Sequence, residues 1–146
     1  MRASLNVTLI ALLAGAACAR EPVEVTDAEY LADLEAVCAD TSATLDALPR
    51  PPDQISVADF AVSAANALDE EAERARGLDA TDELAADHRA FVRNTDEQAA
   101  AWRAISTTEQ ADAQFGELTV RVGELIRGRN DLVDEMGAPG CRRGDV

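Results

Sequence analysis

Apolar residues recur at alternating steps of three and four in four stretches of the chain, and this spacing constrains the fold more than any other feature. It places the apolar side chains of each stretch on one face of an α-helix. The stretches lie between residues 26 and 48, 56 and 76, 81 and 105, and 115 and 136. Short links force neighbouring helices to run antiparallel, so we expect an all-α, up-down-up-down four-helix bundle.

Local signals mark where two of these helices begin and where the last one ends. Thr26 followed by Glu29 has the spacing of a capping box, and Ser56 with Asp59 repeats it. The third helix has a weaker start signal, which we place near Thr81. The fourth should stop at Gly137, because glycine is the usual residue just past a helix end.

The N-terminus is typical of an export signal. Residues 1–17 begin with positive charge and continue as an apolar stretch too short to span a bilayer. We expect a signal peptide at 1–17, a lipid-anchor tether at 18–25 and the bundle domain at 26–146. The formal net charge is −15, and removal of the signal takes away only the charge of Arg2. A surface so acidic disfavours nucleic acid as a partner.

The three cysteines divide into one at the signal boundary and two in the domain. Cys18 follows small residues of the kind that precede a lipidated cysteine, although cleavage after Ala19 at an A-x-A site is the alternative. Either outcome leaves Cys38 and Cys141, which in an exported chain predict a disulfide that closes a loop of about 100 residues. Two separate thiols, one buried and one on the tail, are the other possibility.

These motifs together resemble the small, Ala-rich helical lipoproteins or secreted proteins of actinobacteria. The resemblance rests on the lipobox-like LLAGAAC, on the cysteine-containing first helix and its proline-rich turn, AVCADTSATLDALPRPP, and on the tail DEMGAPGC. Such proteins mostly lack an assigned biochemical role. The resemblance therefore implies a location and a fold, and it transfers no catalytic residue.

Three polar residues fall on the inward stripes, at similar depth from one end of the bundle. Counting residues along antiparallel helices places Glu71, His88 and Arg129 in one layer, as a candidate internal polar cluster. One interpretation is a pocket that binds a small acidic or polar ligand through Arg129, with His88 titrating near neutrality. The other is a structural network in which Arg129 pairs with Glu71, or long side chains that reach outward to solvent.

The sequence offers no pattern for metal, cofactor or catalytic chemistry. A di-iron bundle needs several histidines, and the chain has one. We expect no metal site, no cofactor and no enzyme. The hypothesis is an exported cell-envelope lipoprotein on the extracytoplasmic face of the membrane, held by its N-terminal lipid and acting as a binding or structural module for an unknown envelope protein. The alternative is a soluble secreted protein that binds a small ligand in the bundle interior.

Overall fold

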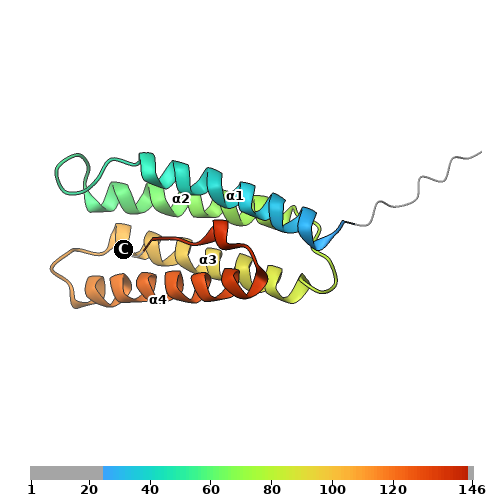
Figure 1. Ribbon diagram of the computed structural model, residues 1–146. Helices are drawn as coiled ribbons and strands as arrows, with labels where there is room; N and C mark the ends of the chain where they lie inside the picture. Colours follow the sequence, from blue (N-terminus) through green and yellow to red (C-terminus); the bar gives the residue numbers. More distant parts are fainter. Residues whose placement is uncertain (1–24, 145–146) are drawn as a thin grey trace, which may run out of the picture.

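The computed structural model describes residues 25–144, which form a four-helix bundle. The helices are α1 (Asp27–Ala47), α2 (Val57–Arg76), α3 (Ala85–Thr107) and α4 (Ala113–Met136), and a short 3-10 helix, η1 (Pro139–Cys141), follows. Successive helices run in opposite directions (Figure 1), so the predicted up-down-up-down architecture is confirmed. The expected signal peptide, its tether and Cys18 lie outside the described residues.

The capping box at the start of α1 forms as its sequence predicts. The Thr26 hydroxyl accepts a hydrogen bond from the Glu29 amide at 3.3 Å, and the Glu29 carboxylate accepts one from the Thr26 amide at 3.0 Å. The Thr26 hydroxyl also donates to this carboxylate at 2.9 Å, and the bonds from the Thr26 amide and hydroxyl lower the pKa of Glu29. At the start of α2, Ser56 caps the amide of Asp59 at 3.1 Å. Local sequence therefore determines both helix starts.

The third helix begins one turn later than its sequence predicts. It starts at Ala85 rather than near Thr81. The Thr81 hydroxyl instead donates to the Asp27 carboxylate at the start of α1, and it accepts a bond from the Leu84 amide at 3.4 Å. Thr81 thus ties the α2–α3 loop to the first helix, which is a tertiary contact that helical periodicity does not reveal.

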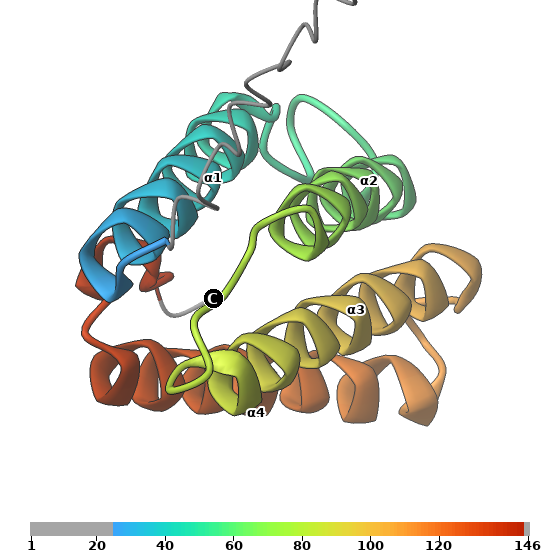
Figure 2. The ribbon, with the colours of Figure 1, turned by 90° about the vertical axis from the view of Figure 1, so that its right-hand side faces the viewer.

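The C-terminal tail completes the bundle by filling the space between α1 and α4. Gly137 ends α4 with a φ of 81°, a left-handed conformation that favours glycine. The chain then turns back and runs between the two helices, whose Cα atoms do not come within 8 Å of each other in the described part of the chain (Figure 2). The Gly140 amide donates to the Glu35 carboxylate of α1 at 2.8 Å. The tail is therefore a structural element of the domain.

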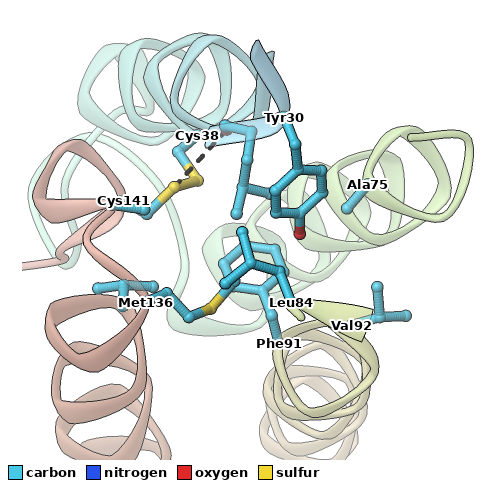
Figure 3. Packing of buried hydrophobic residues seen from close by; sticks show 11 residues of the cluster. Tyr30, Cys38, Ala75, Leu84, Phe91, Val92, Met136 and Cys141 are labelled. Atoms are coloured by element: carbon cyan, nitrogen blue, oxygen red, sulfur yellow. Dashed lines mark hydrogen bonds between the residues drawn. A yellow bond between two sulfur atoms is a disulfide. The ribbon is translucent and has the colours of Figure 1, made fainter. Parts of the chain in front are cut away.

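The disulfide between Cys38 and Cys141 fixes the tail in this position. It joins the middle of α1 to η1 across 103 residues, with the two Cα atoms 5.0 Å apart. Figure 3 shows the disulfide beside the side chains of Tyr30, Phe91 and Met136 in one apolar cluster. The pairing predicted from the number of cysteines is thereby confirmed.

Two apolar clusters lie at opposite ends of the bundle, and buried polar residues separate them. The cluster in Figure 3 gathers Tyr30 and Leu34 of α1 with Phe91 of α3. The second joins residues of α2, α3 and α4: Ala61, Ala101, Ile105, Val122, Leu125 and Ile126. The buried polar residues occupy intermediate positions on the same helices: Glu71, Thr95, Gln98 and Arg129. Across residues 25–144, no helix is long and apolar enough to cross a membrane.

Candidate functional site

Glu71 of α2 and Arg129 of α4 form an ion pair in the centre of the bundle. The two Glu71 carboxylate oxygens accept hydrogen bonds from Arg129 Nη2 at 2.8 Å and Nη1 at 3.0 Å. The side chains are 0% and 1% exposed, so water cannot compete for these bonds. A paired, fork-like contact of this kind is the strongest form of an arginine–carboxylate interaction.

Every N–H group of Arg129 has a partner within the protein. Nε donates to the Cys141 carbonyl at 3.0 Å, Nη1 donates also to the Thr95 hydroxyl at 3.1 Å, and Nη2 lies 3.4 Å from the Cys38 sulfur. The guanidinium carbon also lies 4.5 Å from the centre of the Phe91 ring. A guanidinium has five donors, and these contacts use all of them. Arg129 is therefore a structural residue, and a ligand has no free donor to bind there.

Burial is the largest influence on the Arg129 guanidinium. It lowers the pKa of Arg129, while the Glu71 carboxylate acts in the opposite direction and a second arginine, Arg143, adds to the decrease. Arginine keeps its proton in proteins even so. Arg129 is thus a permanent buried charge rather than a titrating group.

His88, the third predicted member of this cluster, lies elsewhere. Its Nδ1 atom is 2.9 Å from the Tyr30 hydroxyl of α1, and the two rings meet edge to face. No hydrogen bond or ion pair in residues 25–144 joins His88 to Glu71 or Arg129. The prediction placed His88 too deep because it counted from Thr81. With the helix starting at Ala85, His88 lies in the first turn of α3, near the bundle end.

The pKa values of Tyr30 and His88 are both shifted by their surroundings. Burial lowers the pKa of His88, and the nearby positive charge of Arg89 adds to this effect. Burial also raises the pKa of Tyr30 to about 12, helped by the negative charge of Asp87. Both shifts favour the neutral forms. Near neutral pH, the neutral Tyr30 hydroxyl can therefore donate to an unprotonated His88.

Arg143, on the tail, is a member of the polar cluster that the sequence analysis missed. Its Nη2 donates to the Glu71 carboxylate at 2.7 Å, and its side chain is 8% exposed. The Asn130 side chain holds the Arg143 backbone through two hydrogen bonds of 2.9 Å, one to the amide and one to the carbonyl. The available signal was the Cys38–Cys141 pairing, which brings the residues just after Cys141 into the bundle.

A cavity of about 360 Å³ opens beside this cluster. The tail forms part of its wall with Arg142, Arg143 and Gly144. Helix residues supply an apolar lining: Leu45, Phe60, Ala64, Leu68, Trp102 and Ile126. A concave, mostly apolar site with a few convergent polar groups is the usual form of a small-molecule site.

Other kinds of site find less support in the described part of the chain. Residues 25–144 contain no group of three or more histidine, cysteine, aspartate or glutamate side chains placed to hold a metal ion. Comparisons with protein-family models, with characterised proteins and with solved structures give no significant match. The case for function therefore rests on the chain's own geometry.

Proposed function

We propose that this chain is an exported cell-envelope lipoprotein, acylated at Cys18, whose disulfide-braced bundle acts by binding. The observation that carries the proposal is the Cys38–Cys141 disulfide. Structural disulfides belong to oxidising compartments outside the cytoplasm. The disulfide also uses both cysteines of the domain, so Cys18 is left for acylation next to an apolar segment of signal-peptide length.

The proposed location is the extracytoplasmic face of the cell membrane. The tether, residues 18–25, ends where α1 begins, so the lipid would hold the bundle by its N-terminal end. An envelope protein or a small ligand would then be the partner. We favour binding over catalysis because the cavity beside the buried cluster has the form of a small-molecule site. The buried arginine, Arg129, uses all its donors within the fold and so offers no group for chemistry.

The second candidate is a soluble secreted protein that binds a small ligand in the bundle interior. The cavity beside Arg143 supports the binding of a small ligand. The two candidates differ in how the chain is processed at Cys18, and a ligand site is compatible with either.

Cell fractionation of the wild type and of Cys18→Ala tests the anchor. The substitution removes the acylated thiol and leaves small residues for ordinary signal cleavage. We expect the wild type in the membrane fraction, extracted only by detergent, and the variant in the soluble extracytoplasmic fraction or the medium. An identical distribution of both proteins would overturn the lipoprotein proposal.

A further inference from the structure

Within residues 25–144, the buried polar cluster has one more positive charge than negative charge. Glu71 is the only carboxylate in residues 25–144 that forms an ion pair with either Arg129 or Arg143. Two guanidinium groups, 1% and 8% exposed, thus share a single negative charge. Buried charges are costly unless each is paired, so this arrangement leaves room for one further anion.

Arg143 is the member of the cluster that such an anion could reach. Its Nε is buried and has no hydrogen-bond partner, the only buried side-chain nitrogen or oxygen of the described residues in this condition. Nearly all buried polar groups in proteins are hydrogen-bonded, so the Arg143 guanidinium is incompletely satisfied within the described residues. Arg143 also lines the cavity described above, which places its side chain at the edge of a ligand-sized space.

The other arginines of the cavity wall already have acidic partners. Arg50 lies 3.7 Å from Asp46, and Arg142 pairs with Asp134, with all four side chains substantially exposed. The excess charge is therefore located at Arg143. One excess charge matches a singly charged group such as a carboxylate better than a doubly charged phosphate.

We propose that this cavity binds a small monocarboxylate with an apolar body, whose carboxylate pairs with the Arg143 guanidinium and whose apolar part packs against Phe60, Leu68 and Trp102. The inference rests on the binding role proposed above and gives it a ligand class and a site. A fully polar anion would leave the aliphatic and aromatic lining without a partner. The volume of about 360 Å³ lies at the small end for ligand pockets.

The cavity contains its own reporter, because Trp102 is the single tryptophan of the chain. We would titrate the non-lipidated Cys18→Ala chain, with its disulfide intact, with decanoate and with decanol. The two probes have the same chain length and differ in charge. Binding would be followed by Trp102 fluorescence and by calorimetry. Since this form has no lipid, loss of the anchor proposal would leave the binding result unaffected.

A matched pair of variants tests the role of the arginine. Arg143→Gln removes the proposed donor, while Arg121→Gln removes an exposed arginine that pairs with Glu97 outside the cavity. We expect saturable binding of decanoate at one site, at least about tenfold tighter than decanol. We also expect the affinity for decanoate to fall roughly 10- to 100-fold in Arg143→Gln, as for removal of a charge-assisted hydrogen bond. The affinity should not change in Arg121→Gln.

Two results would overturn the proposal. One is the absence of saturable decanoate binding. The other is equal affinity for decanoate and decanol, which would indicate apolar adsorption alone. Equal effects of Arg143→Gln and Arg121→Gln would remove Arg143 from the site. If Arg143→Gln fails to fold, the comparison of decanoate with decanol on the parent chain decides the question.

Discussion

Replacing Glu71 by glutamine should destabilise the domain more than any comparable change of a surface acid. Glu71→Gln keeps the size of the side chain and removes the one negative charge that faces Arg129 and Arg143. Three charge-assisted hydrogen bonds, of 2.7, 2.8 and 3.0 Å, lose their carboxylate acceptor, and the glutamine NH2 group, itself a donor, cannot replace the second oxygen. Arg129, 1% exposed, would remain as a buried charge without a counterion. Breaking a buried pair in this way costs about 3–5 kcal/mol.

The matched control is Glu97→Gln. Glu97 of α3 makes a similar contact with Arg121, at 2.7 Å, but the two side chains are about half exposed. Exposed ion pairs contribute about 0.2–1 kcal/mol. Urea unfolding of both variants and the parent, followed by helical circular dichroism, gives the difference in the free energy of unfolding.

The effects of substituting Glu71 and Arg129 on the free energy of unfolding should be strongly coupled. Adding Arg129→Met to Glu71→Gln removes the unpaired guanidinium, so the double variant should be more stable than Glu71→Gln alone. If Glu71→Gln costs no more than Glu97→Gln, the account of the buried cluster is wrong. The same conclusion follows if the effects of the Glu71 and Arg129 substitutions simply add.

Four further outcomes follow from the fold. Replacing Cys38 and Cys141 together by alanine should lower the free energy of unfolding by about 4.7 kcal/mol in the chain-entropy model, because the loop spans 103 residues, and urea unfolding checks this. The pKa of His88, measured by NMR, should lie below about 6.5. The unfolded chain therefore binds a proton at His88 more readily than the folded domain, so the free energy of unfolding should fall as the pH drops below about 6.5. The pKa of Tyr30 is raised from about 10 in the unfolded chain to about 12 in the folded domain. The stability that this shift contributes is complete below about pH 10 and is lost as the pH rises to about 12. Tyr30→Phe should abolish this loss. Asn130→Ala should cost about 1–3 kcal/mol in the same unfolding assay, because it leaves the backbone amide and carbonyl of Arg143 without their partners.

Features that follow from local spacing, the helical period or the number of cysteines were predictable from the sequence. The Thr26 cap formed as expected because its partner Glu29 is three residues away. The Cys38–Cys141 pair was predictable because export and an even number of thiols leave few alternatives. The meeting of Glu71 with Arg129 followed from the helical period, which put both on inward faces.

Features that depend on where a distant segment lies were not predictable in this way. His88 was misplaced by one helical turn because Thr81 bonds to α1 instead of starting α3. Arg143 was overlooked because residues after a final helix carry no periodic signal. Its position depends on the disulfide and on the Asn130 side chain, which are tertiary contacts. The candidate ligand site consequently became visible only once the tail was placed between the helices.

The intact mass of the mature protein, isolated from native membranes and medium without reduction, tests the central claim most directly. The account predicts a chain that begins at Cys18, carries a lipid-sized addition and has two protons fewer than the form with free thiols at Cys38 and Cys141. A chain beginning at Arg20 without any addition would contradict the anchor. A mass that retains both thiol protons would contradict the disulfide, and with it the observation on which the proposed function rests.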